Sequence, residues 1–366
     1  MQFSSEKRNL LIRRLPLVAL AMLSLVAGVW GGLVRLPVTL SLPVEHANWL
    51  TFHGPLMVCG FLGTVIGLER AVGLGRAWPY TAPILTGAGA MVVAGGGLGS
   101  TGIALITAGS ALFASVALYV VRLQRSAFTV VMCLGGFTWL IGNLLWLRGW
   151  PFPQLVLWWI AFLALTIAGE RLDLSRFQRQ ERWARPLLRL AIGLFLGGVV
   201  LSAMHQTTGR QVAGAGLLAL ALWLGRFDIA RRTVRQSGLP RYMAVCLLVG
   251  YVWLGLAGVL LAAFPDQDTG GRYDAALHSF FLGFVFSMIF GHAPIIFPAV
   301  LNQPVGFHTR FYAHVILLHA ALLLRVSGDL ADWLPGRQWG AIGNGAAIAL
   351  FLLNTVAAVL FPPKPR

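Results

Sequence analysis

The stretch WLTFHGPLMVCGFLGTVIGLER at residues 49–70 is almost uniformly apolar and long enough to cross a membrane as one helix. It carries a histidine, His53, four residues from its start. An imidazole is costly in hydrocarbon, so an ionisable side chain within a membrane segment usually pairs with a partner or marks a functional site. If this stretch crosses a membrane, His53 is therefore expected to have a partner or to belong to a functional site.

The composition predicts an all-α, polytopic membrane protein. Of the 366 residues, 57% are hydrophobic and only 11% are charged, whereas a soluble domain carries about 25% charged residues. Because a span needs about 20 apolar residues, the sequence predicts twelve transmembrane helices. They are expected near residues 15–36, 50–68, 79–97, 101–121, 127–147, 153–169, 187–204, 211–225, 242–264, 275–300, 310–326 and 339–361.

The sequence leaves no room for a soluble domain, because the longest polar stretch is residues 170–185. We therefore expect one transmembrane domain over residues 1–366. The basic N-terminus is followed by a span-length apolar run without a small-residue cleavage site, which predicts no cleaved signal peptide. The three cysteines (Cys59, Cys133, Cys246) sit singly in apolar segments and imply no disulfide framework.

The charges test the span count independently. Twelve spans place 22 of the 28 Lys and Arg residues on the side of the two termini and 6 on the other side, while the acids divide 6 and 6. The whole net charge of +16 thus lies on one side, which the positive-inside rule identifies as cytoplasmic. The arginines are scattered among loops in no nucleic-acid-binding pattern. They favour membrane lipids with anionic headgroups as partners and exclude nucleic acid.

This orientation places His53 and His278 at similar depths near the outer surface, on the second and tenth spans. His292 lies fourteen residues beyond His278, roughly 21 Å deeper, and His314 starts the eleventh span near the inner face. Two imidazoles at one depth can ligate a haem iron from both sides. Small residues beside them would let a flat macrocycle approach: Gly54, Gly60 and Gly283. Alternatively, each histidine binds a neighbouring carbonyl or lines a polar crevice.

The second, sixth and tenth spans end alike, with IGLERAV at 66–72, IAGERLDL at 167–174 and IFGHAPII at 289–296. Aligning Glu69, Glu170 and His292 gives three units of four spans each. Carboxylates and imidazole at one inner site, with His314 as a further inner histidine, could bind a second metal ion or relay protons. Alternatively, Glu–Arg pairs at the helix ends stitch the bundle together.

The motif FHGPLMVCGF resembles the His-Gly-x-x-Met signature of subunit I of the haem-copper oxidases, and LHSFFLGF resembles the start of their tenth span. The longer run LGFVFSMIFGH is similar to the NnrS family, twelve-span haem- and copper-containing membrane proteins associated with nitric oxide stress. The resemblance implies a bacterial inner-membrane protein with pseudo-threefold four-helix units and one b-type haem between His53 and His278. It allows a copper ion, a quinol or cytochrome redox partner, and arginines of the last outer loop, Arg325 and Arg337, as partners of the haem propionates.

The departures from the oxidase pattern limit this expectation. The sixth and seventh spans lack the histidines that ligate copper in that family, and His278 is followed by Ser279 and Phe280 instead of a His-x-His motif. A dinuclear haem-copper centre is therefore not expected. The two arginines are not adjacent here, and either could balance Asp329 or Asp332.

The preferred interpretation is a haem-binding protein that handles nitric oxide or electrons. If it is an enzyme, the expected class is an oxidoreductase. The alternative is a twelve-span secondary transporter, because intramembrane Glu and His and internal repeats are also typical of transporters. A third option is an assembly or scaffold protein that keeps the oxidase fold without a cofactor.

Overall fold

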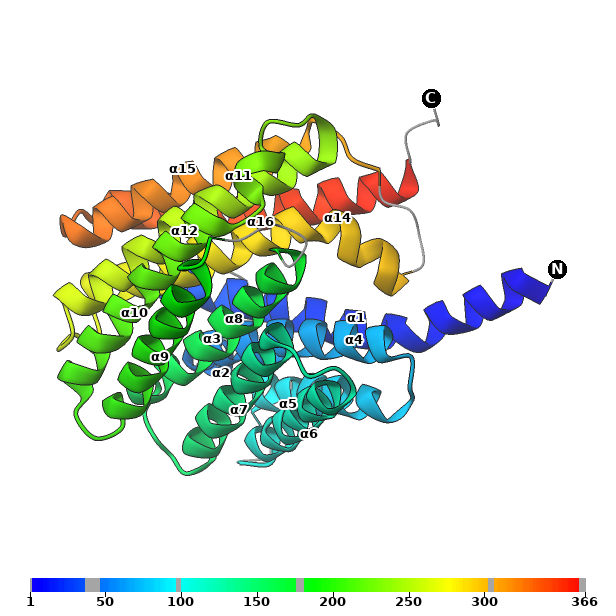
Figure 1. Ribbon diagram of the computed structural model, residues 1–366, viewed down its shortest axis with the longest axis horizontal. Coiled ribbons are helices and arrows are strands. Elements are labelled where there is room, and N and C mark those ends of the chain that lie inside the picture. The colour runs from blue at the N-terminus through cyan, green and yellow to red at the C-terminus, as the bar shows by residue number, and fades with distance from the viewer. Residues whose placement is uncertain (1, 37–46, 97–99, 176–180, 302–305, 362–366) are drawn as a thin grey trace. The chain divides into compact units, whose positions relative to one another are not determined.

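The computed structural model describes residues 2–36, 47–96, 100–175, 181–301 and 306–361, and within these residues it is all-helical. Its elements in chain order are α1 (Gln2–Val34), α2 (Ala47–Thr51), α3 (His53–Pro55), η1 (Leu56–Gly63), α4 (Thr64–Leu74), η2 (Trp78–Tyr80), α5 (Thr81–Gly95), α6 (Thr101–Leu123), α7 (Ala127–Leu147), α8 (Phe152–Ser175), α9 (Ala184–Ser202), α10 (Gln206–Phe227), α11 (Ala230–Thr233), α12 (Gly238–Ala263), α13 (Gly271–His278), η3 (Ser279–Phe286), α14 (Ser287–Leu301), α15 (Phe311–Leu330) and α16 (Leu334–Leu360). The predicted all-α class is confirmed (Figure 1).

Ten helical segments of the described residues are long and apolar enough to cross a membrane, which makes the chain a multi-pass membrane protein. Two of the twelve predicted spans are helices that do not reach this standard. Helix α5 has 15 residues, or about 22 Å, against a hydrocarbon core of about 30 Å. Helix α10 has 22 residues but begins with the polar run QTTGRQ. The number twelve therefore stays a prediction.

Packing divides the chain into two compact units, each discontinuous in sequence. Unit 1 comprises Met1–Arg125, Gly136–Trp150 and Ile295–Pro304, and unit 2 comprises Ser126–Gly135, Pro151–Pro294 and Val305–Arg366. The three four-span units that the sequence suggested also stay a prediction.

In unit 1, α1 packs against η1, α4 and α5, and α5 packs against α6. Glycines allow the last contact, because a Cβ on Gly89 would lie 2.7 Å from the carbonyl oxygen of Gly102. Close approach through small residues is how membrane helices commonly associate. The ring of Trp139, buried and edge-on to Phe113 at 5.4 Å, occupies the space that a side chain on Gly63 would need.

In unit 2, α10 lies between α9 and α12, and α15 lies along α16 (Figure 1). A buried arginine, Arg210 near the start of α10, connects that helix with the start of α8 and with the segment that follows α12. Its guanidinium donates to the carbonyl oxygens of Pro265 and Pro153, both at 2.8 Å, and to the carboxylate of Asp268 at 2.6 Å. Arg210 is therefore a buried residue that stabilises the packing of these segments.

Two segments, η1 and η3, are π-helices of eight residues each. Aligning Glu69 with His292, as the sequence repeat suggested, also aligns Leu56 with Ser279 and Gly63 with Phe286, so the two π segments coincide in register. The third aligned segment does not follow this pattern, because α8 is α-helical throughout. π-Helical turns are rare and occur frequently at functional sites. The histidines of interest, His53 and His278, lie just before these two segments.

Candidate functional site

In unit 1, His53 opens α3, and its ring rests on α1. Its Nδ1 lies 2.5 Å from the carbonyl oxygen of Gly28. A Cβ on Gly32, one turn further along α1, would lie 2.7 Å from the imidazole Cε1, so the absence of a side chain there makes room for the ring. Because a carbonyl oxygen can only accept, Nδ1 carries the proton and the lone pair of the neutral ring is on Nε2.

In unit 2, His278 ends α13, and its Nδ1 also faces a main-chain carbonyl oxygen. Its Nδ1 lies 2.9 Å from the carbonyl oxygen of Asp274, one turn earlier, and 3.2 Å from the carboxylate oxygen Oδ1 of that residue. Both are acceptors, so here too Nδ1 carries the proton and Nε2 the lone pair. Metal-binding histidines commonly donate the second ring N–H in this way.

The arginines expected to bind propionates, Arg325 and Arg337, each pair with a carboxylate of unit 2. Arg325 on α15 donates from Nη2 to Oδ2 of Asp274 at 2.7 Å. Arg337 on α16 places Nε 2.8 Å from Oδ1 of Asp329, a distance of ion pairing without the alignment of a hydrogen bond. Arg337 therefore balances Asp329, as the alternative interpretation held, whereas Arg325 balances an acid that was not considered for it.

Each histidine, within its own unit, has the form that can ligate iron, because a neutral imidazole with its lone pair on Nε2 is a metal ligand. The glycines proposed as space for the macrocycle fit only in part. A Cβ on Gly54 would meet nothing within 4 Å in the described part of the chain. The corresponding space at Gly60 is filled by Ser24 and Ala90, and at Gly283 by the ring of Trp253, so these two glycines serve helix packing.

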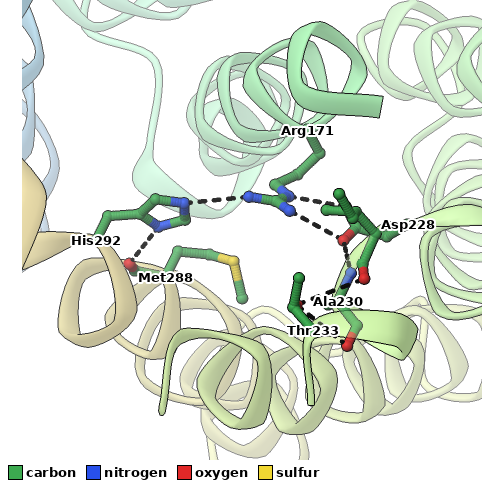
Figure 2. A network of polar contacts seen from close by, with 7 residues as sticks. Arg171, Asp228, Ala230, Thr233, Met288 and His292 are labelled. Carbon is green, nitrogen blue, oxygen red and sulfur yellow. Dashed lines mark hydrogen bonds and ion pairs between the residues drawn. The ribbon is translucent and has the colours of Figure 1, made fainter. Parts of the chain in front are cut away.

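A second polar cluster of unit 2 centres on Arg171 at the end of α8 (Figure 2). Its Nε and Nη2 donate to the two carboxylate oxygens of Asp228 at 2.8 and 2.9 Å, and its Nη1 lies 3.3 Å from Nε2 of His292. The Nδ1 of His292 donates to the carbonyl oxygen of Met288 at 2.7 Å. A guanidinium has no acceptor, so His292 is neutral and accepts with Nε2.

The two histidines of α15 have separate partners. His314 is buried, with Nδ1 3.1 Å from Nδ2 of Asn354 and Nε2 3.0 Å from the hydroxyl of Tyr242. His319 accepts from Nε1 of Trp253 at 3.0 Å, and its Nε2 lies 3.3 Å from the hydroxyl of Ser287. Both rings thus use their two nitrogens to join helices.

An inner metal site gains no support from these contacts. Within the described ranges, no group of three or more His, Cys, Asp or Glu side chains could hold a metal ion. A metal at His292 or His314 would have to displace Arg171, Asn354 or Tyr242 from a ring nitrogen.

Two acids that were not predicted as site residues hold the polar groups of unit 2 together. Asp274 pairs with His278 and Arg325, and Asp228 pairs with Arg171. Asp274 had a local signal, because it precedes His278 by four residues and side chains at that spacing meet on one helix face. Asp228 had none that connects it with Arg171, since the two are 57 positions apart. Its carboxylate also accepts from the backbone N–H of Ala230 at 2.7 Å, at the start of α11.

The fold and the candidate site define an all-helical, multi-pass membrane protein with two histidines oriented by backbone carbonyls. Residues 14–360 match the family described as Domain of unknown function (DUF8744), and the chain belongs to that family. No curated protein matches the sequence significantly.

Proposed function

We propose that this chain is a haem-binding protein of the bacterial inner membrane, similar to subunit I of the haem-copper oxidases and to the NnrS family. It crosses the membrane twelve times with both termini in the cytoplasm. His53 and His278 ligate one b-type haem near the outer surface. The protein handles nitric oxide or electrons with a quinol or cytochrome as redox partner.

The observation that carries the proposal is the hydrogen bond that each histidine makes from Nδ1 within its own unit. Each donates from Nδ1 to a main-chain carbonyl, that of Gly28 for His53 and that of Asp274 for His278. This fixes the tautomer that ligates iron through Nε2. Each also stands just before one of the two π-helical segments.

Within this proposal the protein supplies position and polarity. The carbonyl tethers restrict rotation of the two rings, and glycine at position 32 leaves space for the ring of His53. A bound haem would supply reversible one-electron chemistry or a binding site for a diatomic gas. The tenth span has Ser279 and Phe280, both buried, after His278, which supports one haem without the oxidase dinuclear centre.

The test is the absorption spectrum and metal content of the detergent-purified protein. We expect a Soret band with one haem per chain, and its loss in His53→Ala and in His278→Ala. His205→Ala, at an exposed histidine, is the matched control and should keep the band. A colourless wild-type protein from haem-replete cells overturns the proposal. A colourless protein that drives proton-coupled uptake would be the alternative, a secondary transporter.

A further inference from the structure

The groups that face Nδ1 of the two proposed ligands, His53 and His278, differ in charge. The Nδ1 of His53 faces the neutral carbonyl of Gly28. The Nδ1 of His278 faces both the carbonyl and the carboxylate of Asp274, at 2.9 and 3.2 Å. The other carboxylate oxygen of Asp274 accepts from Arg325 at 2.7 Å. The chain Arg325–Asp274–His278 therefore joins α15 to the end of α13 through charged groups.

A carboxylate that accepts a hydrogen bond from a ligating imidazole changes the reduction potential of the metal that this imidazole binds. It withdraws the Nδ1 proton toward itself and makes Nε2 more basic. A more basic axial ligand stabilises ferric over ferrous haem and lowers the reduction potential. The guanidinium of Arg325 opposes this effect, because it neutralises part of the charge that Asp274 presents to the ring.

We propose that Asp274 and Arg325 are positioning residues that set the ligand strength of His278 and thereby the reduction potential of the haem. This inference rests on the proposed function. It assigns Arg325 to Asp274 in place of the haem propionate. Arg325 is only 8% exposed, and α13 packs against α15, so the pair is held by the fold.

The neighbouring pair of Asp329 and Arg337 completes the charge balance. Asp329 is 1% exposed, and its Oδ1 lies 2.8 Å from Nε of Arg337. The two ion pairs together hold two carboxylates and two guanidinium groups, so their formal charges cancel while the imidazole of His278 is neutral. No propionate is needed to neutralise them.

The experiment is a potentiometric titration of the purified protein, followed by its haem absorption bands. Asp274→Asn keeps the side-chain shape but removes the charge, so the potential should rise. The expected change is about tenfold in the ferric-to-ferrous equilibrium, or about 59 mV. Arg325→Gln leaves the full carboxylate charge behind His278, so the potential should fall. Asp332→Asn, at an exposed acid in the turn between α15 and α16, is the matched control and should leave the potential unchanged.

Opposite shifts in the two variants support the inference, because a purely structural role would move both in the same direction. An unchanged potential in both, with the haem still bound, overturns the inference and leaves the haem proposal standing. If Asp274→Asn does not hold haem, the fall expected in Arg325→Gln still decides the question. Loss of haem from both variants but not from the wild type would mean that Asp274 and Arg325 only support the structure of the haem site, and it would overturn the inference. A colourless wild type overturns both proposals.

Discussion

At the scale of the residue, Arg171 is a buried cation of unit 2 whose charge is balanced by Asp228. The salt bridge that it forms with Asp228 has side chains 2% and 1% exposed. A buried ion pair adds little net stability compared with apolar residues, but the removal of one partner leaves a buried charge without compensation. The pair therefore fixes how the ends of α8, α10 and α11 meet more than it adds to stability.

We expect Arg171→Met to lower the free energy of unfolding by about 3–5 kcal/mol, because it leaves the carboxylate of Asp228 buried and unpaired. The double variant Arg171→Met with Asp228→Asn should recover most of this loss, since the amide keeps the acceptor for Ala230. Thermal unfolding in detergent measures both. The control is Arg226→Gln, which breaks an ion pair whose side chains are 55% and 56% exposed and should change little. Equal losses in the single and double variants would contradict the argument.

The contacts of His314 lead to a prediction that separates structure from metal binding. Both of its ring nitrogens join helices through Asn354 and Tyr242. We expect His314→Ala to lower the unfolding temperature, because it leaves these buried polar partners unsatisfied, and to leave the haem and copper content per chain unchanged. Elemental analysis and the absorption spectrum measure the second outcome. A loss of copper in this variant would restore His314 as a ligand.

At single residues, the sequence predicts only what depends on local spacing along the chain. The apolar surroundings of His53 and His278 predicted partners for both rings. Each ring has a backbone carbonyl as a partner, and His278 also has the carboxylate of Asp274. The pairing of Arg325 with Asp274 depends on how α13 and α15 pack, and no periodicity of either helix encodes it. The same holds for Arg171 and Asp228.

At the scale of the element, the apolar runs predicted where helices occur, but not which turns of them are π-helical. A π turn changes the hydrogen-bonding register from i→i+4 to i→i+5, which hydrophobicity does not record. The segments η1 and η3 are almost wholly apolar, so no side-chain pattern marks their boundaries. Their matching positions in the repeat are the reason to consider the second and tenth spans as equivalent elements.

The packing of the His53 ring against α1 can be tested with glycine variants. We expect Gly32→Ala to displace the imidazole, because the added Cβ would lie 2.7 Å from its Cε1, and so to lower haem occupancy in purified protein. Gly73→Ala also adds a methyl group to a helix of unit 1, but its Cβ would meet nothing within 4 Å in the described residues. This control should keep its haem and be as stable as the wild type or slightly more so. Full haem occupancy in Gly32→Ala would argue against His53 as a ligand.

At the scale of the whole molecule, the span count and the charge distribution have to agree. If α5 and α10 did not cross the membrane, the loops at residues 122–125 and 171–189 would change sides. Their eight arginines would then lie outside the cytoplasm, against the positive-inside rule. Twelve crossings keep them inside. The charges therefore favour twelve, although ten segments satisfy the criteria of length and hydropathy.

Single cysteines at Gln124, Arg182 and Met204 distinguish the two topologies, because all three positions are exposed and each changes sides between ten and twelve spans. With twelve, a membrane-impermeant maleimide added to intact cells should label Met204→Cys, and it should label Gln124→Cys and Arg182→Cys only after the membrane is opened. The native cysteines, all buried, should give little background. With ten spans the pattern is reversed. The reversed pattern would put the carboxyl end of α8, with Arg171, at the outer face. The second and tenth spans keep their direction in both schemes, so the prediction that each of His53 and His278 lies near the outer surface does not depend on which count is correct.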